Sequence, residues 1–225
     1  MNRSYDLLVF DWDGTVVDSE GDIVACMQGA MVSCGLAPAT RDDVRNIIGL
    51  GLIDACQRLM PEFEPSMHER VVQAYRRHWL SAERGPALFP GVDVGLPALA
   101  EAGYTLAVAT GKSRRGLDKG LDESGLRPVF ADTRCADECA SKPHPRMLLE
   151  LMDVLGHAPA RTLMIGDTEW DLLMARDAGC DSLAVSYGVH DRGRLQALGP
   201  RAVVDSFSDI PRWLGINLDT PETTI

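Results

Sequence analysis

Four short segments of the chain carry the side chains that could do chemistry, and they follow or lie between apolar runs of strand length. They are Asp11-Trp12-Asp13-Gly14-Thr15, Thr110-Gly111-Lys112, Lys142-Pro143 and Gly166-Asp167-Thr168-Glu169-Trp170-Asp171. In an open parallel sheet, ligands bind beyond the carboxyl ends of the strands, so we expect these segments to meet at one edge. That edge would hold several carboxylates, a hydroxyl and an ammonium group.

The carboxylates of this predicted edge indicate a metal site. Asp11, Asp13, Asp167 and Asp171 would repel one another unless a cation lay among them. A set of oxygen ligands without soft ligands suits a hard divalent ion, and Mg²⁺ commonly takes one or two carboxylates together with phosphate oxygens of a substrate. The pattern therefore predicts Mg²⁺ as the cofactor.

The remaining groups are those that phosphoryl transfer requires. The hydroxyl of Thr110 and backbone N–H groups at a helix start can hold phosphate oxygens, and Lys142 can neutralise the remaining charge. An aspartate can form a covalent aspartyl-phosphate, which divides one very slow step into two, while a second carboxylate moves the proton. Asp11 and Asp13 fit these two roles.

The elements that must position these groups follow from hydrophobic patterning. Strand-length apolar runs lie at 7–10, 105–109, 162–165, 182–185 and 202–204, and helical segments at 92–102, 116–125, 146–155 and 172–178. Strands that alternate with helices predict a parallel sheet covered on both faces. The expected fold class is α/β, a doubly wound parallel sheet of Rossmann type.

The alternation fails between the first two strands, where the pattern is helical. Apolar residues from Ile23 to Cys34 recur at spacings of three and four, and the whole stretch is too long for a loop. We expect an inserted helical cap at 16–86, and a core made of 1–15 and 87–225. Within the cap, Gly49-Leu50-Gly51 is expected to form a mobile loop, because glycine lets the backbone approach a ligand closely.

Two further expectations concern residues near the motifs. Ser19 and Asp22 have the spacing of a capping box at the first helix of the cap. Lys112 and Lys119 belong to a basic stretch. Such a stretch is also typical of a solvated helix face, so the role of these two lysines is left open.

Composition narrows the class of protein. The chain has 225 residues, 45% of them hydrophobic, and a formal net charge of -11, so it can bury a core while its surface repels nucleic acid and anionic membranes. The first apolar run, Leu7 to Phe10, is shorter than that of a signal peptide, and no apolar stretch approaches about 20 residues. We expect a cytoplasmic protein, a monomer or weak homodimer with reduced cysteines, whose partner is a small phosphorylated metabolite.

Taken together, the motifs resemble those of the haloacid dehalogenase (HAD) superfamily, in its subgroup with a helical cap after the first core strand. The chain is most similar to the phosphoglycolate phosphatase group in the residues Asp11-x-Asp13-Gly14-Thr15, Thr110, Lys142-Pro143 and Gly166-Asp167-x3-Asp171, which stand in the expected order. The resemblance implies a phosphoric monoester hydrolase. It covers essentially the whole chain.

The resemblance also implies roles for single residues. Asp11 would be the nucleophile, and Asp13 the general acid and base as well as a Mg²⁺ ligand through its carbonyl. Asp167 would be the second carboxylate ligand, and Asp171 a partner of the metal through water or a neighbouring group.

The transferring phosphoryl group would be held by Thr110, Gly111 and Lys142. Gly111 departs from the pattern, because an asparagine commonly follows the threonine. Its backbone N–H is still available to phosphate, whereas a side-chain contact is lost.

The predicted function is Mg²⁺-dependent hydrolysis of a phosphoglycolate-like ester or a sugar phosphate through an aspartyl-phosphate. A phosphosugar mutase of the same superfamily is the alternative, although mutases place a histidine where this chain has Ile23. A phospho-accepting signalling domain that is not an enzyme is a third reading, which the length and the helical insertion disfavour. Asp13 argues against halide displacement, and a cap without lysine argues against phosphonate cleavage.

Overall fold

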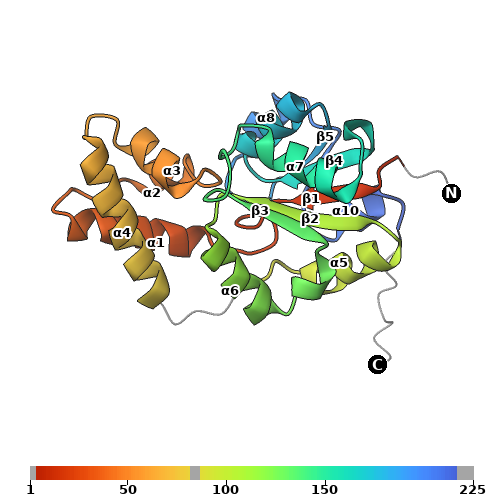
Figure 1. Ribbon diagram of the computed structural model, residues 1–225, viewed down its shortest axis with the longest axis horizontal. Coiled ribbons are helices and arrows are strands. Elements are labelled where there is room, and N and C mark those ends of the chain that lie inside the picture. The colour runs from red at the N-terminus through yellow and green to blue at the C-terminus, as the bar shows by residue number, and fades with distance from the viewer. Residues whose placement is uncertain (1–3, 82–86, 217–225) are drawn as a thin grey trace.

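Six parallel strands form the centre of the molecule (Figure 1). The structure is a computed structural model that describes residues 4–81 and 87–216. The strands lie in the order β3-β2-β1-β4-β5-β6 and span Leu7–Phe10 (β1), Thr105–Thr110 (β2), Asp132–Cys135 (β3), Thr162–Gly166 (β4), Asp181–Val185 (β5) and Val203–Val204 (β6). The predicted doubly wound parallel sheet is confirmed, and β3 is the strand that the apolar pattern did not reveal.

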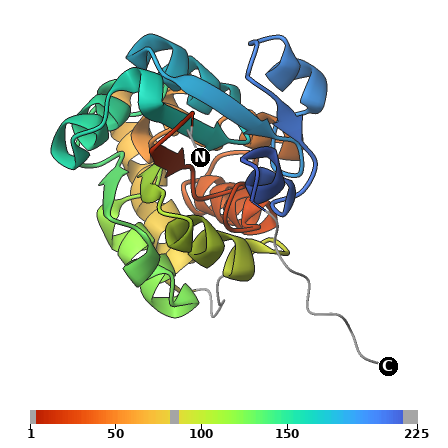
Figure 2. The same cartoon turned by 90° about the vertical axis from the view of Figure 1, so that its right-hand side faces the viewer.

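Helices cover both faces of the sheet (Figures 1 and 2). Successive side chains of a strand point to opposite faces, so Leu8 and Phe10 of β1 join one cluster and Leu7 and Val9 the other. The first cluster is closed by α5 (Val92–Glu101), α6 (Arg114–Ser124) and α10 (Asp209–Trp213), and the second by α7 (Arg146–Leu155) and α8 (Glu169–Ala178). A short helix, α9 (Arg192–Gln196), packs beside β5 and β6.

Four helices leave the core between β1 and β2 and form the cap on one side of the molecule in Figure 1. They are α1 (Glu20–Ser33), α2 (Arg41–Arg45), α3 (Leu52–Leu59) and α4 (Pro65–Ser81). Their buried side chains form a cluster separate from the two that flank the sheet. The periodic residues Ile23, Met27, Ala30 and Met31 all contribute to it, as their helical spacing predicted.

The start of α1 corrects one expectation. Ser19 is the residue before the helix, but its side chain makes no capping hydrogen bond. Its hydroxyl instead donates to Oδ1 of Asp13, 2.6 Å away. The predicted capping box is therefore wrong: the oxygen of an N-cap must accept an N–H of the first turn, whereas Ser19 has φ -119° and ψ 2° in place of an extended backbone and its side chain is turned toward Asp13.

The strand order places the carboxyl ends of β1 and β4 at the point where the chain changes direction along the sheet. From β1 the chain proceeds through β2 to β3 on one side, and from β4 through β5 to β6 on the other. Ligands of open α/β sheets bind in the crevice at this point. Asp11 directly follows β1 and Asp167 directly follows β4.

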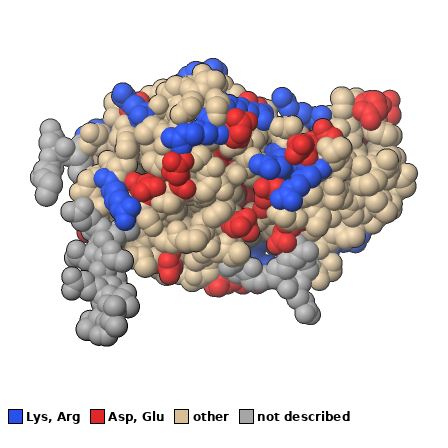
Figure 3. All heavy atoms as spheres, turned by 180° about the vertical axis from the view of Figure 1, so that it is seen from behind, with Lys and Arg blue, Asp and Glu red and all other residues tan. Residues whose placement is uncertain are grey.

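The surface carries charges of both signs. On the face shown in Figure 3, basic and acidic side chains lie interspersed. Within residues 4–81 and 87–216, no helix combines the length and the apolar character that crossing a membrane requires.

Candidate active site

Three carboxylates meet at the end of β1 and β4. Oxygen atoms of Asp11, Asp167 and Asp171 lie within 4.8 Å of one another, and all three residues are fully buried. Asp171 reaches the group from the first turn of α8, where its Oδ2 accepts the backbone N–H and the hydroxyl of Thr168, at 3.1 and 2.7 Å. It therefore serves as a helix cap and as a member of the acidic group.

One ammonium group is held between two of these carboxylates. Nζ of Lys142 lies 2.7 Å from Oδ1 of Asp11 and 2.6 Å from Oδ1 of Asp171, with its side chain fully buried. Burial acts to lower the pKa of Lys142, but Asp11 and Asp171 outweigh it and raise that pKa overall. The lysine thus stays charged.

Asp167 is fixed by two donors. The Thr15 hydroxyl and the backbone N–H of Val189 each donate to it, at 2.8 Å. Gly14 makes room for this carboxylate, because an added Cβ would collide with it and because the glycine has φ +84°. The glycine of the first motif is therefore required for steric and conformational reasons together.

The charge balance of the group calls for a further cation. Burial raises the pKa of Asp11 well above its usual range, an effect that Lys142 opposes and that Asp171 and Asp167 reinforce. Burial and then Asp171 raise the pKa of Asp167 to about 7. With all three carboxylates ionised, the single ammonium of Lys142 leaves two negative charges on the group. A divalent ion that prefers oxygen ligands fits this donor set.

Asp13 lies apart from the three carboxylates. Nζ of Lys112 lies 2.8 Å from each of its oxygens, and Ser19 donates to Oδ1. The metal contact predicted for the carbonyl of Asp13 remains a prediction. Lys112 is a residue that sequence reasoning left without a role, although its place two residues after Thr110 and the presence of only three lysines in the chain were usable signals.

The segment Thr110-Gly111-Lys112 lies beneath the cap loop. Thr110 ends β2 with almost no exposed surface, and its hydroxyl accepts the N–H of Lys112 at 3.1 Å. A Cβ added to Gly111 would lie 2.5 Å from the carbonyl oxygen of Leu50 and 2.6 Å from that of Gly49. Backbone of the cap loop therefore occupies the space that a side chain at position 111 would need.

The cap loop also contacts two other motif segments. Gly49, at φ +97°, lies against Thr168 and Trp170, and the N–H of Gly51 donates to Oγ of Ser141 at 2.6 Å. Ser141 directly precedes Lys142, and sequence reasoning did not select it because a lone serine in a loop carries no distinguishing pattern.

These contacts predict the effect of larger side chains at Gly49 and Gly51 of the cap loop. A Cβ at Gly51 would lie 2.9 Å from Oγ of Ser141 and 3.0 Å from Cβ of Ala136, so Gly51→Val should lift the loop and break its hydrogen bond. We expect a changed ranking of substrates, with a much smaller change for a generic phosphate ester. Gly49→Val should reduce both activities, because it also presses on Thr168, which holds Asp171.

The control for Gly51→Val is Gly21→Val, a cap glycine with no atom within 4 Å of an added Cβ. It should leave the ranking unchanged across a panel of phosphorylated metabolites. A Gly51→Val enzyme with the wild-type ranking would show that the loop does not contribute to selectivity.

Comparison with known proteins agrees with this geometry. The family model described as haloacid dehalogenase-like hydrolase matches residues 8–185. The chain is 38% identical over 211 residues to the probable phosphatase IndB of Dickeya dadantii, covering 91% of each chain. It is 34% identical to a phosphoglycolate phosphatase of Agrobacterium fabrum, covering 90% of this chain and 89% of that one.

A solved structure shows the same architecture. The crystal structure of a predicted phosphoglycolate phosphatase from Haemophilus somnus superposes with a TM-score of 0.83 at 26% identity, covering 93% of this chain and 98% of that one. The fold and the acidic site thus define an α/β protein with a helical insertion and an acidic crevice. The chain belongs to the haloacid dehalogenase-like hydrolase family.

Proposed function

We propose that this protein is a Mg²⁺-dependent phosphatase that hydrolyses a small phosphate monoester through an aspartyl-phosphate on Asp11. The observation that carries the proposal is the state of Asp11, whose Oδ1 is held by Lys142 while its buried Oδ2 has no hydrogen-bond partner. An oxygen that is held in position and that accepts no hydrogen bond is suited to attack phosphorus. The two relatives described above, which are named as phosphatases, support the same activity.

Asp11 and Asp167 would hold the Mg²⁺, with the carbonyl of Asp13 as a third protein ligand. When bound, the ion supplies electrostatic stabilisation of the phosphoryl oxygens. Asp171 acts through Lys142, whose ammonium it holds in place. Thr110 and the backbone of Gly111 bind the phosphoryl oxygens from the end of β2.

The chain's own residues account for the two chemical steps. Oδ2 of Asp11 attacks phosphorus, the bond to the ester oxygen breaks, and Asp13 gives that oxygen a proton. Water then attacks the phosphorus of the aspartyl-phosphate, Asp13 takes its proton, and the bond between Asp11 and phosphorus breaks to release inorganic phosphate. Asp13 ends the cycle in the form in which it began.

Residues 16–86 act in this proposal as a cap over a core of 1–15 and 87–225. A closed cap excludes water until the leaving group departs, and an open cap admits the hydrolytic water. The cap loop contacts described above support this role, since they join the cap to the segments of Thr110, Lys142 and Asp167. The cytoplasmic location and a monomeric or weakly dimeric state remain predictions.

The pocket beside Asp13 favours a short leaving group. Its cavity of about 60 Å³ is lined from the core by Trp12, Asp13 and Lys112 and from the cap by Trp79. A buried water needs about 10–15 Å³ on this measure, so the pocket has room for a short leaving group. A phosphoglycolate-like ester therefore fits this pocket.

Phosphate release tests the proposal. With Mg²⁺, the protein should release phosphate from a small monoester over many turnovers, and excess chelator should stop this until Mg²⁺ is restored. A signalling domain would accept one phosphoryl group and stop. Undiminished turnover in excess chelator would contradict the role of the metal.

The pH dependence of metal binding gives an independent readout. Without metal, the raised pKa values of Asp11 and Asp167 keep these groups protonated in acid, and a cation must displace those protons. We expect Mg²⁺ to raise the thermal midpoint more at about pH 8 than at about pH 5.5. Asp167→Asn should reduce this shift, and an equal shift at both pH values would contradict the assignment.

A further inference from the structure

The chain that follows β5 wraps around Asp167. A Cβ added to Gly188 would lie 2.4 Å from both Cβ and Oδ2 of Asp167, so a glycine is needed where the backbone passes this carboxylate. The N–H of Val189 donates to Oδ2 of Asp167 at 2.8 Å, and the N–H of His190 donates to the carbonyl of Asp167 at 3.3 Å. Residues 188–190 therefore fix one of the two proposed carboxylate ligands of Mg²⁺.

Val189 also contacts the cap. Its side chain is 3% exposed and lies in the hydrophobic cluster of the cap, whose other buried members in the described part of the chain all come from residues 23–74. Its carbonyl accepts a hydrogen bond from Nη2 of Arg45, which belongs to α2. One core residue thus contacts the cap through its side chain and carbonyl, and contacts Asp167 through its N–H.

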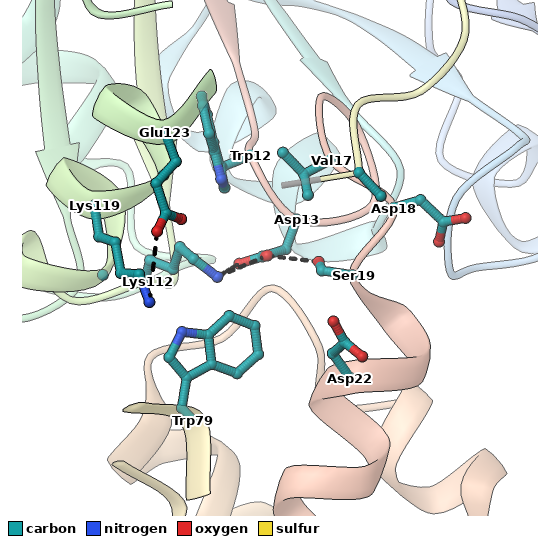
Figure 4. A pocket seen from close by; sticks show the side chains of 13 residues that line it. Trp12, Asp13, Val17, Asp18, Ser19, Asp22, Trp79, Lys112, Lys119 and Glu123 are labelled. Atoms are coloured by element: carbon teal, nitrogen blue, oxygen red, sulfur yellow. Dashed lines mark hydrogen bonds and ion pairs between the residues drawn. The ribbon is translucent and has the colours of Figure 1, made fainter. Parts of the chain in front are cut away.

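The two contacts with the cap depend on where the cap lies. The pocket beside Asp13 has walls from both parts of the molecule, with Trp12 on the core side and Trp79 on the cap side (Figure 4). A cap that moved away from the core would take Arg45 and the hydrophobic cluster with it. The N–H donor to Asp167 would then lose two of the groups that hold Val189 in place.

We propose that Val189 is a positioning residue for Asp167 and that Arg45 makes this positioning depend on the cap, so that cap closure strengthens Mg²⁺ binding and Mg²⁺ favours the closed cap. The inference rests on the proposed function, because it takes Asp167 as a ligand of Mg²⁺. Loss of a group that orients a metal ligand typically lowers metal affinity by about 10–100-fold. Coupling between two binding events is reciprocal, so each of the two effects requires the other.

The first test measures the Kd of Mg²⁺ by calorimetry without substrate. Arg45→Met should raise this Kd by about fivefold or more, the lower end of typical coupling between sites. Arg41→Met is the matched control, because Arg41 lies on the same helix and also pairs with Glu20, while its described hydrogen bonds do not reach Val189. It should keep the wild-type Kd.

A second pair of variants tests the side chain of Val189. Val189→Ala keeps the N–H and the carbonyl but removes two methyl groups from the cluster of the cap, so it should raise the Kd of Mg²⁺ as Arg45→Met does. Val72→Ala removes the same groups from the same cluster within α4. It should lower the thermal midpoint by a similar amount and leave the Kd unchanged. Arg45→Lys, which can still donate to the carbonyl, should restore part of the affinity.

Cap closure can be followed independently by hydrogen exchange. The N–H of Gly51 in the cap loop donates to Oγ of Ser141 in the core, so its exchange reports whether the loop lies on the core. Saturating Mg²⁺ should slow exchange of the peptide that contains Gly51 in the wild-type protein, and should slow it less in Arg45→Met.

Four results would overturn the inference and leave the phosphatase proposal standing. They are an unchanged Kd in Arg45→Met, an equal rise in Arg41→Met, an equal rise in Val72→Ala and Val189→Ala, and exchange at Gly51 that Mg²⁺ does not alter. A wild-type protein that binds no Mg²⁺ would instead overturn the metal site of the proposed function, and the inference with it.

Discussion

Asp11→Asn is expected to lower turnover by about 10⁴-fold or more, whatever phosphate ester is used. The amide keeps the size of the side chain but is a far weaker nucleophile, and without a covalent intermediate the enzyme loses the two-step route. Phosphate monoesters hydrolyse so slowly in water that little background turnover remains. Steady-state phosphate release with saturating Mg²⁺ measures the effect.

The control for this variant is Asp177→Asn, an exposed aspartate on α8 that pairs with Arg176. It should retain wild-type turnover. The Asp11→Asn protein should also remain folded, because Lys142 keeps Asp171 as a partner and Asn can still accept the N–H of Trp12, as Oδ1 of Asp11 does at 2.6 Å. A clean Asp11→Asn preparation with substantial turnover would refute the assignment of the nucleophile.

Lys142→Met should be the most destabilising single change at the site. The lysine side chain is fully buried and is held by both Asp11 and Asp171, so its removal leaves buried carboxylates without a partner. Removing one member of a buried ion pair typically costs about 3–5 kcal/mol. We expect a loss of that order in the free energy of unfolding, together with loss of turnover.

The sign of the pH dependence follows from the raised pKa values. A carboxyl group whose pKa is higher in the folded state than in the unfolded state contributes stability in acid and loses it as the pH rises through the folded pKa. Lys142→Met should therefore be destabilised more at about pH 8 than at about pH 5, in urea unfolding without metal. An effect that is equal at both pH values, or absent at the higher one, would contradict the role of Lys142 as the counter-charge.

Lys119→Met provides the comparison for this stability measurement. Its side chain is 41% exposed and pairs with Glu123 across one turn of α6. Exposed pairs of this kind contribute about 0.3–0.5 kcal/mol. The difference in the free energy of unfolding between Lys142→Met and Lys119→Met measures the effect of burial.

Most of the sheet could be predicted because its strands are buried on both faces and appear as continuous apolar runs. The range predicted for β1 matched that of the structure, whereas β3 has the sequence Asp-Thr-Arg-Cys and only its last residue is buried. It lies at the edge of the sheet, where polar side chains reach solvent, so apolar patterning has nothing to detect there. Strand ends differed by a residue or so, as at Thr110 and Gly166, because pairing extends into the motifs.

The sequence indicated which segments carry the site residues, but it could not show which of their side chains contact one another. Asp11, Asp167 and Asp171 form one group around Lys142, while Asp13 pairs with Lys112. This division depends on the directions of side chains at the ends of different strands, which spacing along one strand does not encode. The predicted roles of these residues in catalysis remain predictions.

The contacts between the cap loop and the core could likewise not be predicted from the sequence. Two glycines suggested a loop that could approach the core, and Gly111 stood out only as a departure from a family pattern. The structure joins the two observations, since the carbonyl groups of Gly49 and Leu50 occupy the space that a side chain at Gly111 would need. Two positions about sixty residues apart in the chain are complementary in shape, and a single sequence does not reveal such a pair.

The central claim, a covalent intermediate on Asp11, can be tested directly by acid quenching during turnover and mass spectrometry of the proteolysed protein. With Mg²⁺ and a small phosphate ester, we predict a peptide that contains Asp11 and carries the mass of one phosphoryl group, with fragmentation placing that mass on Asp11. With an aryl phosphate, whose leaving group departs without a proton, Asp13→Asn should increase its amount, because the base that activates water is missing, and Asp11→Asn should remove it. A phosphoryl group on another residue, or rapid turnover with no modified peptide at any quench time, would contradict the mechanism.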